Sequence, residues 1–314
     1  MILSASRRTD IPRFYLDWLL NRFDEGFALV RNPKNRTQVS RVPLDRDSVD
    51  CIAFWTKDPA PLLARVERLE RAAPAPFFVQ FTLNAYGPDV EAGLPFTAKL
   101  VETFRALSRS LGPERVVWRY SPILVGGRYT VEHHARCFEA LADSLRGCTK
   151  SCRLSFLDVY PKIAQRMAAL GLQDVLAEQK VPLALLLAEL GAARGIAVGG
   201  CGDGALDDAG LARAGCIDAD TVARVAGVDA GPRRGAGRRG ACRCVPSVDV
   251  GSYDTCANGC AYCYANPGEP SGGAPWRRRL YDPSAPMLCD ALRPGDHVAD
   301  RVAAKLPPAQ LRLF

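Results

Sequence analysis

Three cysteines stand close together in the last third of the chain, at Cys256, Cys260 and Cys263. Spacings of four and three residues allow three thiolates on one tight loop to face a single ion or cluster, and three soft ligands leave one coordination position open. A closed structural zinc site needs a fourth ligand. The chain has only three histidines, all distant from this loop in sequence, although a distant cysteine could complete a zinc site. The ligand count therefore favours a [4Fe–4S] cluster with an open iron over zinc.

A second group of cysteines precedes the first, at Cys201, Cys216, Cys242 and Cys244. Seven of the twelve cysteines lie between Cys201 and Cys263, which core packing alone does not predict. Disulfides are rare in a reducing compartment. Four thiols could close around a second, auxiliary [4Fe–4S] cluster or a zinc ion, or remain without metal as core residues. A second cluster is the favoured expectation, and the other two stay open.

The elements that must position these cysteines alternate along the first two-thirds of the chain. Short apolar runs predict strands at residues 2–5, 51–55, 77–83, 116–120, 153–156 and 195–199, and helical spacing predicts helices at residues 11–23, 61–71, 96–111, 131–145 and 182–193. This alternation is typical of parallel strands joined by helical crossovers. Six such units favour an α/β fold with a full or partial (β/α) barrel over a minimal open sheet. We expect residues 1–267 to form this domain and residues 268–314 a carboxyl-terminal extension.

Polar side chains lie at or just after the ends of several predicted strands. In a barrel these ends converge on one mouth, where ligands bind. Arg119 directly follows a buried run, and a charge in that position needs a partner. The expected pocket residues are Ser4, Ser6, Arg7, Arg8, Asp10, Lys57, Gln80, Arg119, Ser155 and Asp158.

The spacing of Cys256, Cys260 and Cys263, with Tyr262 as the aromatic residue before the last cysteine, resembles the cluster loop of radical S-adenosylmethionine (SAM) enzymes. In that superfamily the open iron binds the amino and carboxylate groups of SAM. An electron from the cluster then cleaves SAM to a 5′-deoxyadenosyl radical. The resemblance implies a [4Fe–4S] cluster, SAM, an electron donor, and Tyr262 packed beside the cofactor.

The cluster loop of that superfamily usually follows the first strand, whereas here it follows residues 247–252. A barrel tolerates circular permutation because neighbouring strands stay neighbours wherever the chain is cut. The resemblance therefore implies a permuted radical SAM barrel. Residues 248–251 would form its first strand and residues 2–5 its second.

The loop after the second strand normally holds the SAM amino group. In this chain Ser4, Ser6 and Asp10 would accept hydrogen bonds from that ammonium, and Arg7 or Arg8 would hold the carboxylate. Arg119 and Ser155 would complete the cofactor pocket. The alternative for Asp10 is that it only caps the first helix, and both roles can coexist.

Nearly the whole chain also resembles an uncharacterised bacterial family, domain of unknown function 1848. That family is noted for a carboxyl-terminal cysteine group like that of radical SAM proteins, and it suggests no substrate. The resemblance rests on residues 4–12, 30–33, 39–42, 54–57, 80–83, 118–120, 155–156, 216–218 and 263–266.

Basic residues and the tail point to nucleic acid as a partner. The net charge is +7, and arginines cluster at Arg233, Arg234, Arg238, Arg239 and Arg243 and again at Arg277, Arg278 and Arg279. Clustered arginine can contact phosphate, or simply solubilise a surface. The segment Gln310–Phe314 resembles the peptide by which bacterial DNA-repair proteins dock on the sliding clamp, unless it folds back on its own domain. The cysteine spacing is also similar to that of spore photoproduct lyase, a radical SAM enzyme that repairs DNA.

No stretch approaches the ~18 apolar residues of a membrane span, and no signal peptide is evident, so a cytoplasmic location without membrane contact is expected. The favoured interpretation is a radical SAM-type enzyme acting on nucleic acid. One alternative is a non-catalytic or electron-transfer iron–sulfur protein, which would bind a cluster without SAM. Another is a zinc-stabilised nucleic-acid-binding module, although a barrel-sized domain with a polar mouth argues against it.

Overall fold

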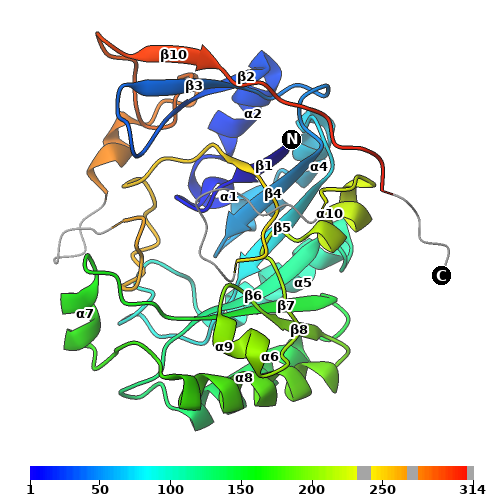
Figure 1. The fold of residues 1–314 in the computed structure, drawn as a ribbon, viewed down its shortest axis with the longest axis vertical. Helices are drawn as coiled ribbons and strands as arrows, with labels where there is room; N and C mark the ends of the chain where they lie inside the picture. The colour runs from blue at the N-terminus through cyan, green and yellow to red at the C-terminus, as the bar shows by residue number, and fades with distance from the viewer. Residues whose placement is uncertain (232–241, 267–274, 310–314) are drawn as a thin grey trace.

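The computed structural model describes residues 1–231, 242–266 and 275–309, and its centre is a seven-stranded sheet (Figure 1). The strands are β1 (Ile2–Ala5), β4 (Cys51–Thr56), β5 (Phe77–Thr82), β6 (Val116–Ile123), β7 (Ser151–Phe156), β8 (Ala197–Gly200) and β9 (Val248–Asp249). Their order is β8-β7-β6-β5-β4-β1-β9, and every pair is parallel. The predicted α/β class and parallel sheet are therefore confirmed. The edge strands β8 and β9 share no ladder within the described ranges, so the sheet does not show a closed barrel.

The short strand β9 lies beside β1, as the permuted order predicts. Leu3 is paired with Val248 and Ser4 with Asp249. The loop that follows β9 and the loop that follows β1 therefore leave the same edge of the sheet next to each other.

Helices and sheet alternate as predicted, but two predicted helices are each broken in two. The helices are α1 (Ile11–Phe14), α2 (Leu16–Glu25), α3 (Ala60–Leu63), α4 (Val66–Ala72), α5 (Thr97–Leu111), α6 (Val131–Ser144), α7 (Ala164–Ala169), α8 (Ala177–Ala192), α9 (Gly204–Asp208) and α10 (Ala219–Ala226), with a 3-10 helix at Trp276–Leu280. Tyr15 interrupts the first pair with φ −137°, because its hydroxyl reaches across to the carbonyl of Thr255. Arg65 interrupts the second pair with φ −127°. Helix α8 begins at Ala177, so that Pro182 lies inside the helix and does not start it.

The two faces of the sheet are buried under different layers. Leu3, Phe54 and Trp118 belong to the large core that also includes side chains of the crossover helices. Their neighbours Ile2, Ala53 and Val117 point to the other face and pack with residues of the described ranges 216–230 and 242–245, including Cys216 and Cys244. Parallel sheets are normally covered on both faces. The segment that carries the second cysteine group therefore provides part of the cover for one face.

His134 on α6 is completely buried and accepts a hydrogen bond from Tyr120 Oη to Nδ1 (2.8 Å) while Nε2 donates to the carbonyl of Leu124 (2.6 Å). Burial lowers the pKa of His134 to about 4. The unfolded histidine, with a pKa near 6.5, binds a proton more readily, so stability should fall as the pH is lowered from 7 to 5. The expected loss is about 2 kcal/mol. Urea unfolding at pH 7 and pH 5 should show this loss of stability in the wild type and not in His134→Gln. Equal losses in both proteins would contradict the prediction.

A smaller sheet caps one end of the molecule. It has the order β10-β3-β2 and consists of β2 (Phe27–Arg31), β3 (Gln38–Pro43) and β10 (His297–Asp300). Strand β10 lies in the predicted carboxyl-terminal extension and pairs in parallel with β3. Trp18 Nε1 donates to the carbonyl of Ala285 (2.8 Å). The described part of the extension thus packs on α2 and β3.

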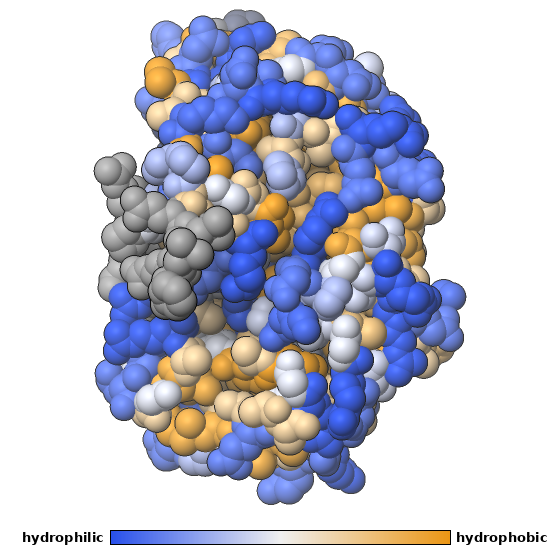
Figure 2. Space-filling model, turned by 90° about the vertical axis from the view of Figure 1, so that its right-hand side faces the viewer, coloured by the Kyte–Doolittle hydropathy of each residue, from blue (hydrophilic) through white to orange (hydrophobic). Residues whose placement is uncertain are grey.

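On the face drawn in Figure 2, hydrophilic residues cover much of the surface, and apolar residues lie towards its lower end and also along its right-hand side. Helix α8 lies at that end in Figure 1 and exposes Leu185 and Leu186. Among the described residues, no helix has both the length and the apolar character needed to cross a bilayer.

Candidate metal and cofactor site

The cluster loop, which we define as residues 256–263, leaves the end of β9 and is held by the loop after β5. Ala261 N donates to the carbonyl of Val90 (2.8 Å), and Gly93 N donates to the carbonyl of Asn258 (3.0 Å). Arg13 of α1 donates to the side chain of Asn258 as well. Two separate segments, the loop after β5 and helix α1, therefore fix the path of the loop.

Two opposing effects act on the thiols of the cluster loop. Burial disfavours their thiolate form, and nearby backbone N–H groups favour it. Burial raises the pKa of Cys256 to about 12 and raises those of Cys260 and Cys263. Backbone N–H groups oppose this effect: Asn258 N–H points at the sulfur of Cys256, and those of Ala265 and Asn266 point at the sulfur of Cys263. Hydrogen bonds of this kind stabilise the charged form.

The sulfur atoms of the cluster loop are near one another but not packed together. The charge of Cys260 acts on those of Cys256 and Cys263. Among the described residues, however, three sulfur atoms lie within 4.8 Å of one another only at Cys201, Cys216 and Cys244. In a [4Fe–4S] cluster each cysteine binds a different iron, which needs wider spacing than ligands of one ion. Since the sulfur atoms of the cluster loop do not all lie within 4.8 Å of one another, they suit the wider spacing of a cluster better than that of a single ion.

A buried network of polar side chains lies close to Cys260 and includes a cation, Lys57. Lys57 Nζ lies 2.7 Å from a carboxylate oxygen of Glu91, which also accepts from Tyr262 Oη and from Asn84 Nδ2 (3.1 Å). Burial lowers the pKa of Lys57, but the negative charges of Glu91 and Cys260 together outweigh it, so that this pKa is raised. The charge of Lys57 in turn favours the thiolate of Cys260. Sequence reasoning placed Lys57 and Tyr262 here but missed Glu91 and Asn84, which lie in a loop without a motif.

Gly93 leaves room for the cluster loop. A Cβ at this position would lie 2.8 Å from the carbonyl oxygens of Ala257 and Asn258. Gly93→Ala should therefore displace the loop, lower the iron content and cost about 1–3 kcal/mol of stability. Gly204→Ala is the matched control, because nothing lies within 4 Å of its Cβ. Iron analysis and thermal unfolding of both variants check this, and an unchanged Gly93→Ala protein would refute it.

Residues at the end of β1 and in the loop after it (residues 6–10, the β1 loop) converge on Asp249. The sequence analysis did not single out Asp249. Ser4 Oγ (2.8 Å), Ser6 Oγ (2.7 Å) and Arg7 N (2.8 Å) all donate to its carboxylate. Arg8 Nε lies 3.8 Å from the same group. Asp249 faces inward from β9 directly opposite Ser4, and the alternation of the strand was the signal that could have found it. The carboxylate thus fastens the β1 loop to the strand before the cluster loop.

Asp10 joins three elements. Its carboxylate accepts from Arg13 N (3.1 Å), Lys57 N (2.9 Å) and Asn258 Nδ2 (2.9 Å). Burial raises the pKa of Asp10, and these hydrogen bonds work in the opposite direction. The predicted helix cap is confirmed, and the same side chain also holds the cluster loop.

Arg7 and Arg119 both lie close to the indole ring of Trp55. Their guanidinium carbons lie 4.7 Å and 4.9 Å from the ring centre of Trp55. Arg7 Nη2 and Arg119 Nε are buried and have no hydrogen-bond partner among the described residues. A buried donor without a partner is costly, so these two N–H groups are available to a bound anion, and we call their position the anion place. Tyr264, next to Cys263, donates to the carbonyl of Arg7 (3.1 Å), which puts this place beside the cluster loop.

The remaining predicted pocket residues lie farther along the sheet. Ser155 shares a hydrogen bond with Ser121 and links β7 to β6. Gln80 donates to the carbonyl of Cys216 and thus contacts the second cysteine group. Asp158 is exposed after β7. Only part of the predicted mouth therefore borders the cluster loop.

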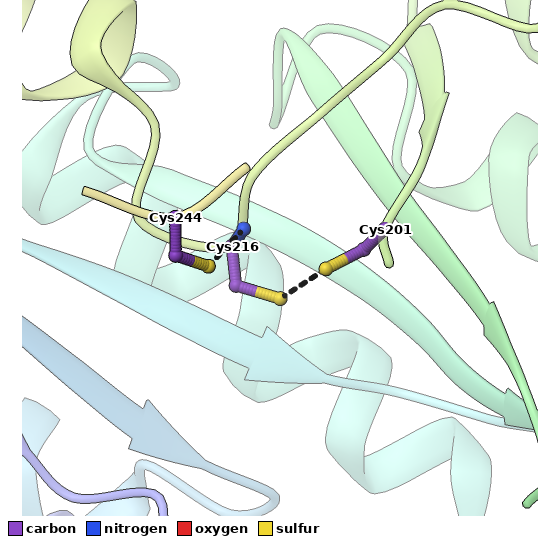
Figure 3. Close-up of side chains that lie close together, drawn as sticks. All are labelled: Cys201, Cys216 and Cys244. Atoms are coloured by element: carbon purple, nitrogen blue, oxygen red, sulfur yellow. Dashed lines mark hydrogen bonds between the residues drawn. The ribbon is translucent and has the colours of Figure 1, made fainter. Parts of the chain in front are cut away.

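The second cysteine group comes together above the sheet (Figure 3). The sulfur atoms of Cys201 and Cys216 are 3.1 Å apart. Cys244 Sγ accepts from the N–H groups of Cys216 (3.2 Å) and Ile217 (3.5 Å). Side-chain contacts with Cys201, Cys216 and Cys242 lower the pKa of Cys244. The sulfur atoms of Cys201, Cys216 and Cys244 thus lie together, and Cys242 interacts with Cys244.

A cavity of about 660 Å³ opens next to these elements. Its lining includes the basic residues and tyrosines Arg8, Lys34, Arg36, Lys162, Tyr160, Tyr253 and Tyr264. Of the predicted arginine clusters, Arg277 is buried and paired with Asp290 at 2.7 Å. Arg233, Arg234, Arg238 and Arg239 and the tail Gln310–Phe314 lie outside the described residues.

Comparisons with known proteins place the chain in a family. A search of curated proteins and a search of solved structures each found no match. The model of a family described as "Domain of unknown function (DUF1848)" matches residues 2–265, a range that includes both cysteine groups. Because this match covers most of the 314 residues, the chain belongs to that family.

Proposed function

We propose that the chain is a radical SAM-type iron–sulfur enzyme. The observation that carries this proposal is the pairing of β9 with β1, which brings the cluster loop beside the anion place formed by Arg7 and Arg119. When bound, a [4Fe–4S] cluster with an open iron supplies the electron and the coordination position for reductive cleavage of SAM. The place of β9 beside β1 supports this proposal, because a circularly permuted strand order predicts that pairing.

In this proposal different residues of the chain bind the cluster and SAM. Cys256, Cys260 and Cys263 hold three irons of the cluster. Arg7 and Arg119 orient the SAM carboxylate with the donors that have no partner among the described residues. An anion bound by both guanidinium groups would lower the repulsion between their two positive charges.

The substrate class that the cavity favours is nucleic acid. Arg8, Lys34, Arg36 and Lys162 are suited to phosphate contacts, and tyrosines such as Tyr264 are suited to stacking on bases. Tyr264 is also the residue after Cys263, so a base on this ring would lie near the cluster loop.

The test of the cofactor proposal is anaerobic purification followed by iron, sulfide and EPR measurements with and without SAM. We expect about four irons per chain at the cluster loop and an EPR spectrum of the reduced protein that SAM alters. Formation of 5′-deoxyadenosine with a chemical reductant would establish cleavage. If SAM leaves the EPR spectrum of the cluster unchanged, the result would instead indicate an electron-transfer protein.

The test of the substrate class is binding of short single-stranded DNA and RNA at several salt concentrations. Lys34→Ala/Lys162→Ala should weaken binding, and the slope of log K against log [salt] should decrease by about 2. Lys99→Ala, on the exposed surface of α5, is the matched control. Equal binding by both variants would remove nucleic acid from the proposal while leaving the cofactor chemistry intact.

A further inference from the structure

The second cysteine group differs from the cluster loop in the spacing of its sulfur atoms. Those of Cys201, Cys216 and Cys244 all lie within 4.8 Å of one another, and two are only 3.1 Å apart (Figure 3). Four thiolates in a tetrahedron around one zinc ion, with Zn–S bonds of about 2.3 Å, have sulfur atoms about 3.8 Å apart. The observed group has the dimensions of a site for one ion.

We propose that Cys201, Cys216, Cys242 and Cys244 bind a single structural zinc ion. Cys242 supplies the fourth thiolate, because its side chain contacts that of Cys244 two residues farther along the chain. A site of four cysteines is closed and leaves no position for a substrate. Its role differs from that of the cluster loop, and this assignment replaces the auxiliary cluster expected from the sequence.

The peptide that carries Cys216 is held in place by bonds that do not involve a metal. Gln80 donates to the carbonyl of Cys216, and Arg153 Nε donates to that of Gly215 (3.1 Å). A Cβ at Gly215 would lie 2.9 Å from the carbonyl oxygen of Arg243, so the two ligand segments touch through their backbones. The geometry of the ligands is therefore prepared by the fold.

A cation lies beside the sulfur atoms. Arg119 is close enough for its charge to act on Cys216, Cys201 and Cys244. Four thiolates around a divalent ion carry a net charge of −2, which is costly to bury without compensation. Arg119 supplies part of that compensation from the side of the sheet.

The position of the site explains what an ion there would do. Cys201 directly follows the edge strand β8, and Cys244 precedes β9, the strand at the opposite edge. The ion would tie these two edges together across one face of the sheet. It would stabilise the fold whether or not the cluster loop is loaded.

The experiment compares zinc, iron and sulfide in the anaerobically purified full chain and in variants of each cysteine group. In the variant C256A/C260A/C263A we expect one zinc per chain and no iron. Cobalt bound in its place should give the visible absorption of a tetrahedral thiolate site. Cys242→Ala, which keeps three ligands, should lose zinc to a chelator at least tenfold faster. Cys137→Ala/Cys148→Ala, which changes two cysteines outside both groups, should behave as the wild type.

Three outcomes would overturn the assignment. Iron and sulfide retained by C256A/C260A/C263A would mean a second cluster at this site. The absence of any metal from that variant would mean a packed thiol group. A mass lower by two hydrogens, restored by a reductant, would mean a disulfide between Cys201 and Cys216. None of these outcomes bears on SAM binding at the cluster loop, so the two proposals can fail separately.

Discussion

Cys260→Ala is expected to lower the iron content of the protein at least tenfold and to abolish SAM cleavage. Cys260 is the most buried ligand of the cluster loop, with 8% of its surface exposed. The cluster would retain only two cysteines, and no histidine of the chain lies in the loop to replace the third. Iron and sulfide analysis, with the EPR spectrum of the reduced protein, measures the loss.

Cys148→Ala is the control for this variant, because Cys148 lies outside both cysteine groups and only packs against the core. It should keep the wild-type iron content. Zinc should be unchanged in both variants. A Cys260→Ala protein with four irons per chain would show that the cluster loop is not the iron site and would end the radical SAM proposal.

Lys57→Met is expected to destabilise the protein by about 3–5 kcal/mol, because it leaves the buried carboxylate of Glu91 without its cation. The side chains of Lys57 and Glu91 are only 13% and 5% exposed. The double variant Lys57→Met/Glu91→Gln removes both charges and keeps a group that accepts from Tyr262. It should recover most of the lost stability.

The exposed pair Lys99–Glu102 on α5 supplies the matched control. Its side chains are 68% and 66% exposed, and such pairs contribute about 0–1 kcal/mol. Urea unfolding of Lys57→Met, Lys99→Met and the double variant measures the differences. Similar small losses in the two single variants would show that the Lys57–Glu91 pair does not hold the cluster loop.

Much of the central sheet could be predicted from the sequence because buried parallel strands are continuous apolar runs. Strand β1 was predicted with its observed bounds, and β4 to β7 within a few residues. Helix breaks were not predictable, since the one at Tyr15 depends on a contact with Thr255, far away in the chain. The small sheet was missed because β10 pairs with β3 only after the extension folds back.

The candidate site was predictable where residue type and spacing carry the chemistry, as in the cluster loop. Asp249, Glu91 and Asn84 could not be found in that way, because each acts through partners that are close only in space. The distances between the sulfur atoms of the second cysteine group could not be predicted from the sequence either. A list of four cysteines cannot separate one ion from a cluster, whereas the 3.1 Å between Cys201 and Cys216 argues for one ion.

The pairing of β1 with β9 also governs the order in which the molecule can assemble during synthesis. Leu3 and Val248 are register partners in neighbouring strands although they lie far apart in the chain. Strand β1 can pair with β4 early, but its other side exposes unpaired N–H and C=O groups until the ribosome has released β9. The cluster loop follows β9, so the iron site that we propose could form only after nearly all of the sheet has been synthesised. Iron loading would then be a late event, and a nascent chain stalled before β9 would present an open edge to other chains.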